Sequence, residues 1–177
     1  MSPTIRFRRT VTAVGVTLSL ILVAGCKLVE RTDSRAAQAA ARSTAPPQRQ
    51  VIQPEGVARL PVFSTAVRTG DLLFLSGQIG TKPGVSPPEV VEGGIEPETR
   101  QAFENIKTVL AATGLGLGDL VKCTVFLADI NDYAAMNSVY VTFFPNDPPA
   151  RSAMAGTGLA LGAKVEIECI AAYPAGA

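Results

Sequence analysis

The pattern of apolar and polar residues predicts a hairpin and then a helix in the middle of the chain. A turn sequence at Thr69–Asp71 separates two apolar runs, and the second, Leu72–Leu75, is typical of a buried strand. The next stretch, 81–94, is rich in Pro and Gly and is typical of a surface loop. From Pro97, which suits a first helical turn, apolar residues recur at helical spacing as far as Gly114, a natural stop. We therefore expect a core-facing amphipathic helix over this range.

A strand, a helix and a final strand are predicted after it. Apolar residues at alternate positions predict a strand at 120–127, whose apolar face comprises Val121, Cys123, Val125 and Leu127. A helix capped by Asn131 or Asp132 and ended by Pro145 is expected next, with a buried stripe of Met136, Val139 or Tyr140, and Phe143. The alternation at 165–168 predicts the last strand. This order of elements favours an α+β domain with two helices packed on one face of a sheet.

The first 26 residues have the layout of a bacterial export signal. Three arginines precede a mostly apolar segment from Val11 to Val23, and small residues then lead to Cys26. The segment is short for a transmembrane helix, and the residues before the cysteine resemble a lipobox. We expect residues 1–25 to be a lipoprotein signal peptide, with Cys26 as the lipidated first residue of the mature protein. An uncleaved amphipathic anchor and an ordinary signal with a chance cysteine are the alternatives.

The remaining chain divides into a tether and one domain. Residues 26–50 are rich in Arg, Ala, Gln, Ser and Pro and have no apolar stripe, so we expect a flexible linker. Residues 51–177 have the length of a single domain. The expected location is the cell envelope, with the domain exported and held to a bacterial membrane through the lipid on Cys26.

Composition narrows the chemistry. Hydrophobic residues make up 47% of the sequence and charged residues 18%, as in a globular protein. A net charge of +1 gives no electrostatic footprint for nucleic acid. With no histidine and only three cysteines, the sequence has little for a transition-metal site, and we expect neither metal nor cofactor. Proton transfer would then fall to carboxylates, lysine, tyrosine, cysteine or water.

Arg151 is the candidate functional residue that stands out from the residues alone. It lies among prolines and small residues, ahead of the strand that carries Glu166 and Glu168. An arginine can hold a carboxylate in two parallel hydrogen bonds, so a site for a small anionic substrate is one interpretation. A surface arginine paired with a solvated glutamate is the other.

Two cysteines, Cys123 and Cys169, lie in strand-like runs. We expect two small buried thiols, because cysteine packs well in a core and neither residue has a neighbouring histidine to activate it. Export would also permit a disulfide between them.

Five motifs carry a resemblance to a known family. They are LeuSerGlyGlnIle at 75–79, GluThrArgGlnAlaPheGluAsnIleLys at 98–107, ThrValPheLeuAlaAspIleAsnAspTyr at 124–133, ProAlaArgSer at 149–152 and ValGluIleGlu at 165–168. In this order they resemble the Rid family of imine deaminases, the YjgF/RidA type, over residues 51–172. The resemblance implies a YjgF/chorismate-mutase-like α+β fold and a homotrimer with its sites between subunits.

The resemblance also implies roles for the two charged candidates. It implies that Arg151 binds the carboxylate of a 2-imino acid and that Glu166 positions or activates water. Glu168 would share the strand face of Glu166, so a supporting or merely solvated carboxylate is the interpretation for it.

Four further residues match positions that line the family's pocket. Ser76 and Asn137 match polar positions. Phe63 stands where many members have tyrosine, which removes a hydroxyl and makes that wall apolar. Ala153 stands where several members have cysteine, so no thiol chemistry is expected there, although its backbone N–H remains.

The function implied is hydrolysis of 2-iminopropanoate or 2-iminobutanoate to a 2-oxo acid and ammonia, outside the cytoplasm. An imine carbon beside a carboxylate is electrophilic, so orientation, charge neutralisation and one positioned water could suffice. The alternative is a non-catalytic lipoprotein that keeps the fold and captures a small carboxylate or acts as a scaffold. Hydrolysis of a related C–N bond is a third possibility.

Overall fold

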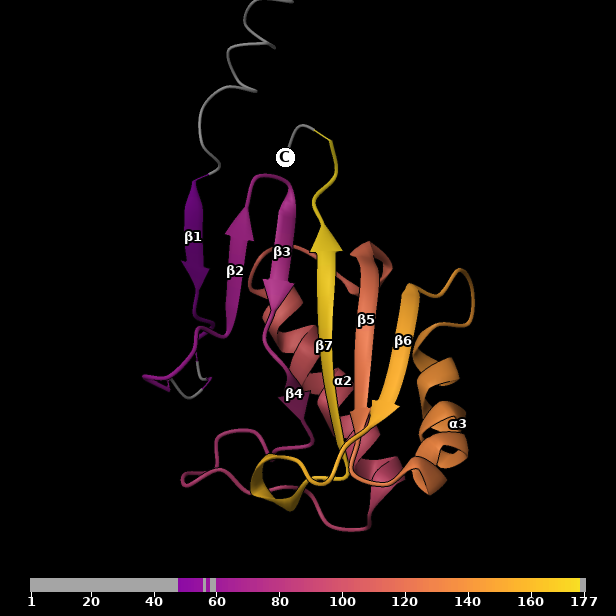
Figure 1. Ribbon diagram of the computed structural model, residues 1–177. Helices are drawn as coiled ribbons and strands as arrows, with labels where there is room; N and C mark the ends of the chain where they lie inside the picture. The colour runs from indigo at the N-terminus through magenta and orange to yellow at the C-terminus, as the bar shows by residue number, and fades with distance from the viewer. Residues whose placement is uncertain (1–47, 56, 58–59, 176–177) are drawn as a thin grey trace, which may run out of the picture. The chain divides into compact units, whose positions relative to one another are not determined.

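The computed structural model describes residues 48–55, 57 and 60–175, which form an α+β unit (Figure 1). Its seven strands make one sheet in the order β1-β2-β3-β7-β5-β6, and β4 also pairs with β7. The strands are β1 (Arg49–Ile52), β2 (Ala66–Thr69), β3 (Leu72–Leu75), β4 (Gln78–Ile79), β5 (Leu120–Leu127), β6 (Ala150–Ala155) and β7 (Val165–Ala172). The helices are α2 (Ile95–Ala111) and α3 (Tyr133–Phe143).

The expected signal peptide and Cys26 lie outside the described residues. Of the expected linker, residues 48–50 are described, and Arg49 and Gln50 belong to β1, which pairs antiparallel with β2. Within the described part of the chain, no helix is long and apolar enough to cross a membrane.

Both helices pack on one face of the sheet, as the order of elements predicts. Every second residue of β7, beginning with Val165, is buried against them, and the intervening residues face away. Phe103 of α2 is fully buried and stacks on Phe143 of α3, with ring centroids 4.6 Å apart. Truncating a buried phenylalanine typically costs about 3–5 kcal/mol, so Phe103→Ala should strongly destabilise this layer.

The first predicted helix is confirmed, although it begins at Ile95, before Pro97, and ends at Ala111, before Gly114. Pro97 lies in the first turn of α2, where Glu96 and Glu98 face the positive end of the helix dipole. The buried residues of α2 include Phe103, Ile106, Val109 and Leu110, which recur at the predicted spacing. Gly114 follows the helix with φ at +75°, a conformation that favours glycine, so the chain turns there.

The second helix begins at Tyr133, but the predicted side-chain cap is wrong. Asp132 is at the N-cap position in helical conformation and makes no capping bond, and Asn131 makes none either. Instead, the Asp129 carboxylate accepts the Asn131 backbone N–H at 2.9 Å and caps the short 3-10 turn Ile130–Asp132 that leads into α3. Asp129 can do this because its extended backbone lets its side chain reach the turn.

The predicted apolar face of β5 is correct except at Val121. Cys123 and the alternate residues after it are buried, whereas Val121 is 46% exposed and its neighbour Leu120 is buried. The pairing of β5 with β7 is irregular between Leu120 and Lys122, where a β-bulge shifts the register. A bulge adds one residue to a strand, so the alternation before it is reversed.

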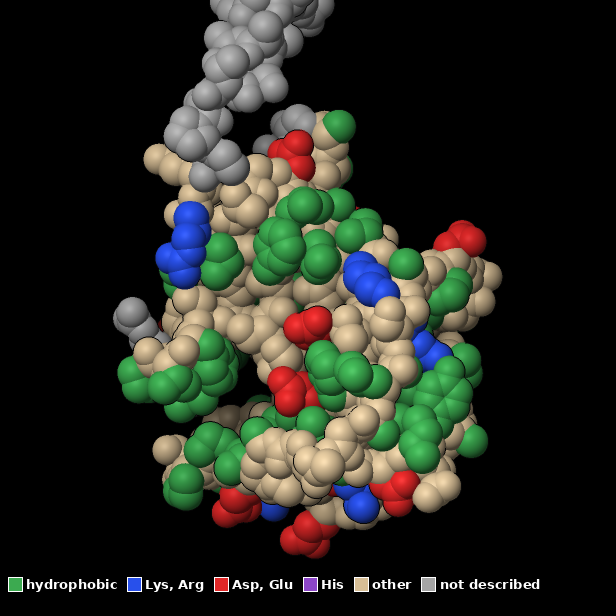
Figure 2. All heavy atoms as spheres, viewed as in Figure 1, with side chains coloured by type: hydrophobic (Ala, Val, Ile, Leu, Met, Phe, Trp, Pro, Cys, Tyr) green, Lys and Arg blue, Asp and Glu red, His purple; other side chains and the backbone are tan. Residues whose placement is uncertain are grey.

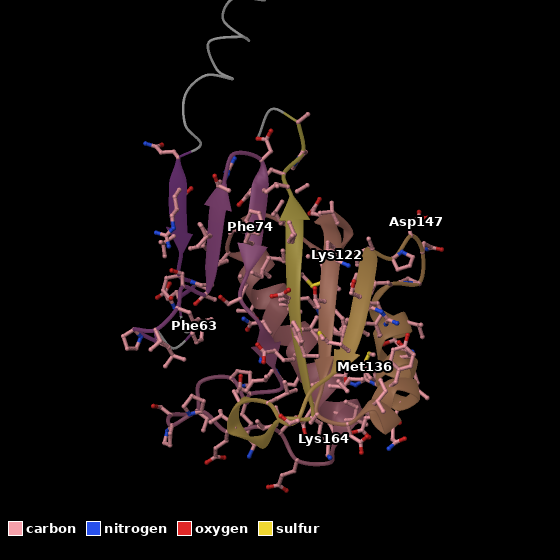
Figure 3. All side chains as sticks on the ribbon, in the orientation of Figure 1. Phe63, Phe74, Lys122, Met136, Asp147 and Lys164 are labelled. Carbon is pink, nitrogen blue, oxygen red and sulfur yellow. A yellow bond between two sulfur atoms is a disulfide. The ribbon has the colours of Figure 1, made fainter. Side chains whose placement is uncertain are left out.

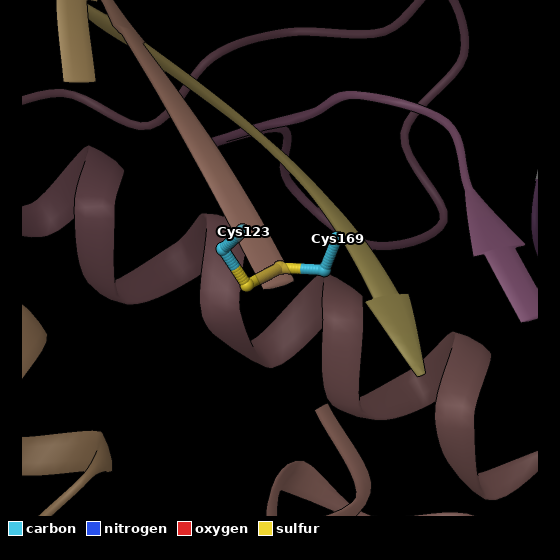
Figure 4. Close-up of a disulfide and its surroundings, with 2 residues drawn as sticks. All are labelled: Cys123 and Cys169. Carbon is cyan, nitrogen blue, oxygen red and sulfur yellow. A yellow bond between two sulfur atoms is a disulfide. The ribbon is translucent and has the colours of Figure 1, made fainter. Parts of the chain in front are cut away.

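Cys123 and Cys169 form a disulfide, so the expectation of two free buried thiols is wrong (Figure 4). The register of β5 and β7 places the two residues directly opposite each other, with Cα atoms 4.1 Å apart and both side chains in the core. Strand pairing therefore brings together two thiols that lie 46 residues apart in the chain.

Candidate active site

Arg151 is placed by a parallel crossover. β6 runs parallel to β5, and α3 forms the connection between them. Arg151 pairs with Cys123, whose side chain lies in the core beneath the helices. Because paired residues share a face, Arg151 points to the helix-covered side, next to α3.

Three residues of α3 hold the Arg151 guanidinium. Its Nη1 donates to Asn137 Oδ1 at 2.7 Å, and its Nη2 donates to Tyr133 Oη at 3.0 Å. The Tyr140 ring lies against it, with 4.5 Å between Cζ and the ring centroid. The three residues are spaced four and three apart, so they form one stripe on the helix. Arg151 is therefore oriented within a single chain.

The side chains around Arg151 are an amide oxygen and a phenol oxygen that accept its hydrogen bonds, together with the Tyr140 ring. The ion pairs in the described residues are Lys82–Glu89 and Lys107–Glu104, and neither involves Arg151. A guanidinium has five N–H donors, of which two are used here. The remaining N–H groups make a planar donor set that fits a carboxylate, and Arg151 is half-buried, which strengthens such a bond.

Two tyrosines beside Arg151 have shifted pKa values in opposite directions. The Asn137 side chain, and then the positive charge of Arg151, lower the pKa of the Tyr133 phenol. Burial raises the pKa of Tyr140, despite the nearby guanidinium. The Tyr140 Oη is buried with no hydrogen-bond partner among the described residues.

Glu166 lies on the opposite, helix-free face of the sheet. It alternates with the buried residues Val165 and Ile167 of β7 and is half-buried. Figure 2 shows this face, with acidic side chains near its centre and apolar side chains around them. Glu168 shares the face and is exposed, as predicted. A Cβ atom at Gly77 would lie 2.7 Å from Glu166 Cδ, so the carboxylate has its place only because residue 77 has no side chain.

The other predicted pocket residues lie in three different places. Ala153 pairs with Val125 and so shares the face of Arg151. Ser76 precedes Gly77, and its hydroxyl donates to the Ser64 carbonyl at 2.7 Å. Phe63, 50% exposed, lines a cleft of about 340 Å³ beside β1. Figure 3 shows Phe63 on the β1 side of the sheet, far from Met136 of α3.

The structure therefore brings Arg151 and Asn137 into contact and places Ala153 on the same face, but leaves Glu166 on the other face of the sheet. Tyr133, which the sequence did not single out, contacts Arg151 directly. The sequence feature that could have identified Tyr133 is its helical spacing from Asn137, because residues four apart lie on one helix face.

A family model described as endoribonuclease L-PSP matches residues 53–173. The chain belongs to this family. A RutC family protein of Pyrococcus horikoshii is 44% identical over 109 residues, which is 62% of this chain and 85% of that protein. A 2-iminobutanoate/2-iminopropanoate deaminase of Rattus norvegicus is 40% identical over 114 residues, which is 64% of this chain and 82% of that protein.

The solved structures confirm the resemblance to the Rid family. A protein of unknown function from Yersinia pestis, assigned to the conserved Rid protein family, matches with a TM-score of 0.66 and 35% identity. The match covers 71% of this chain and 99% of that protein. Two helices on a mixed sheet are thus the fold of this endoribonuclease L-PSP family member.

Proposed function

We propose that the protein hydrolyses small 2-imino acids, such as 2-iminopropanoate and 2-iminobutanoate, to 2-oxo acids and ammonia. The observation that carries the proposal is the planar donor set of Arg151, which is held in place by Asn137 and Tyr133 and has no carboxylate partner among the described residues. Similarity to mammalian proteins with this activity in their names supports the choice of substrate.

The chemistry needs few groups. Arg151 holds the substrate carboxylate and thereby orients the neighbouring imine carbon. Glu166 takes a proton from a water molecule while the water oxygen bonds to the imine carbon. The C=N double bond becomes a single bond, and the proton passes to the nitrogen. This gives a carbon that bears a hydroxyl and an NH2 group. Glu166 then carries the hydroxyl proton to that NH2 group, so the C–N bond breaks, ammonia leaves, and the C–O bond becomes the ketone of a 2-oxo acid. Ser76, Phe63 and the backbone of Ala153 would complete the pocket.

The proposal requires more than one copy of the chain, because Arg151 and Glu166 lie on opposite faces of the sheet. We propose a homotrimer in which Arg151 of one subunit meets Glu166 of the next. Exposed apolar residues on the helix-free face, including Phe74 and Met154, would be buried in such an assembly. Light scattering on a fragment beginning at Gln48 tests this, and a monomer at micromolar concentration would exclude a shared site.

We further propose that the protein is anchored in the cell envelope through a lipid on Cys26. The support is the signal-like pattern of the first 26 residues. Metabolic labelling with palmitate tests it, because Cys26→Ser should abolish incorporation. Label retained by that variant would contradict the assignment.

A second function, non-catalytic capture of a small carboxylate or a scaffold role, is favoured by one observation. The Arg151 cluster is complete within one chain, whereas Glu166 is not near it. The family description names an endoribonuclease, but a sequence with net charge +1 and no histidine offers no support for RNA cleavage.

Ammonia release separates the enzyme from the binder. An amino-acid oxidase generates 2-imino acids in situ, and the protein should then accelerate ammonia release above the rate of spontaneous hydrolysis. Arg151→Ala is the matched control. Acceleration that this variant lacks supports the deaminase, whereas pyruvate binding without acceleration supports the binder.

A further inference from the structure

A phenol hydroxyl stands beside the guanidinium of Arg151, on a residue that neither the motifs nor the named relatives assign a role. Tyr133 is the first residue of α3, and its Oη accepts a hydrogen bond from Arg151 Nη2 at 3.0 Å. The oxygen is thus used as an acceptor, which leaves the hydroxyl proton to point elsewhere. The Asn137 side chain also hydrogen-bonds to this phenol and lowers its pKa, as a donor to the oxygen does, and none of the hydrogen bonds between described residues has the Tyr133 hydroxyl as its donor.

The position of Tyr133 makes that proton accessible. The side chain is 39% exposed, and its ring centroid lies 5.6 Å from the Arg151 Cζ. Asn137 fixes Nη1 of the same guanidinium, so Nη2 is held toward the phenol. A carboxylate that accepts hydrogen bonds from Arg151 would therefore also lie within reach of the Tyr133 hydroxyl.

Arg151 also improves Tyr133 as a donor. A hydroxyl that accepts a hydrogen bond from a cation is polarised, and its own O–H donates more strongly. The lowered pKa of Tyr133, caused by the Asn137 side chain and the charge of Arg151, agrees with this polarisation. The other phenol beside Arg151 belongs to Tyr140, whose hydroxyl is buried, so Tyr133 offers the exposed hydroxyl of the two.

We infer that the Tyr133 hydroxyl binds the ligand by donating a hydrogen bond to the carboxylate that Arg151 holds. The ligand class is a small, planar 2-oxo or 2-imino acid, and Tyr133 adds selectivity for the ionised carboxylate. The inference rests on the proposed function, because it needs Arg151 to bind a carboxylate. It adds a binding role to a side chain that otherwise only supports the arginine.

Calorimetric titration of pyruvate into the full chain tests the role. Tyr133→Phe keeps the ring and removes only the hydroxyl, so the Kd for pyruvate should rise about tenfold, as expected for a hydrogen bond to a charged group. The control is Tyr173→Phe, because Tyr173 also lies against an arginine, with Arg68 Cζ 3.8 Å from its ring centroid, but directly after β7. Tyr173→Phe should leave the Kd unchanged.

A spectroscopic measurement separates ligand contact from a purely structural role. The sequence has three tyrosines, so fluorotyrosine labelling gives three ¹⁹F resonances, which Tyr→Phe variants assign. Pyruvate should shift the Tyr133 resonance and leave that of Tyr173 in place, while the thermal midpoint of ligand-free Tyr133→Phe stays at the wild-type value. A Tyr133→Phe variant with wild-type affinity overturns the inference and leaves the proposed function intact. If wild-type protein binds no pyruvate in an Arg151-dependent manner, the proposed function fails, and the inference fails with it.

Discussion

The helix-covered and helix-free faces of the sheet place their charged residues by different means. On the covered face, Arg151 is fixed by two hydrogen bonds and a ring contact from a single helix. On the open face, the Glu166 carboxylate occupies space that exists because Gly77 has no side chain. In the proposed mechanism, the covered face supplies the anion-binding half of the site. The open face supplies the reactive half, which needs a partner surface to complete it.

The largest expected effect separates binding from chemistry on the two faces. Glu166→Gln keeps the side-chain shape but removes the proton acceptor, so turnover should fall about 10²- to 10⁴-fold while pyruvate still binds. Arg151→Ala should abolish pyruvate binding, and turnover with it, with Arg151→Lys intermediate because lysine lacks the planar fork. Steady-state ammonia release and calorimetry measure the two properties. Normal turnover by Glu166→Gln would remove Glu166 from the mechanism.

The disulfide should stabilise the covered face. Cys169, Cys123 and Arg151 lie in one row across β7, β5 and β6, and the bridge joins the first two. A cross-link that closes a loop with a sequence separation of 46 contributes about 3–4 kcal/mol to the unfolding free energy in the chain-entropy account. Replacing both cysteines by alanine should remove most of this, as measured by urea unfolding. An unchanged unfolding free energy would show that strand pairing, without the disulfide, accounts for the stability of this part of the sheet.

Mixing two inactive variants tests whether the faces meet between subunits. In trimers assembled randomly from equal amounts of Arg151→Ala and Glu166→Gln chains, about a quarter of the sites would combine intact residues from two neighbours. Ammonia release should recover to roughly that fraction of the wild-type rate. Each variant mixed with itself is the control. No recovery in demonstrably mixed trimers would mean that Arg151 and Glu166 serve different sites.

The smallest effect concerns the support of Glu166. Gly77→Ala would force the carboxylate aside, because the added Cβ lies too close to it, and turnover should fall about tenfold with little change in pyruvate affinity. Gly116→Ala is the matched control, since no atom lies within 4 Å of a Cβ at that position. In a Glu166→Gln background, Gly77→Ala should add no further loss. An additive loss would assign Gly77 a role of its own.

Helices and strand alternation were readable from the sequence because their signals are local. The spacing of Phe103 and Ile106 and the stop at Gly114 fixed α2 correctly. The bulge beside Val121 was not readable, because it arises from the pairing of β5 with β7. The disulfide of Cys123 and Cys169 depends on the same pairing.

The sequence predicted which residues belong to the candidate site, but not how they are arranged. Motif resemblance selected Arg151, Asn137 and Glu166, and the structure confirms that the first two are in contact. It could not indicate that Glu166 points the other way, because β6 was not recognised as a strand and the faces follow from its pairing with β5. Tyr133 was missed because its hydroxyl has a role only once the crossover places β6 beside α3.

The disulfide has a consequence for proteolysis. The covalent ring that it closes runs from residue 123 to residue 169 and includes Tyr133, Asn137, Arg151 and Glu166. Most of the segment between β6 and β7 is exposed, including Gly158 and Leu161, so a protease would cut within this ring. The two fragments would remain joined and migrate as one species until a reducing agent is added. A nicked protein could therefore keep every charged group of its site on a single covalent molecule.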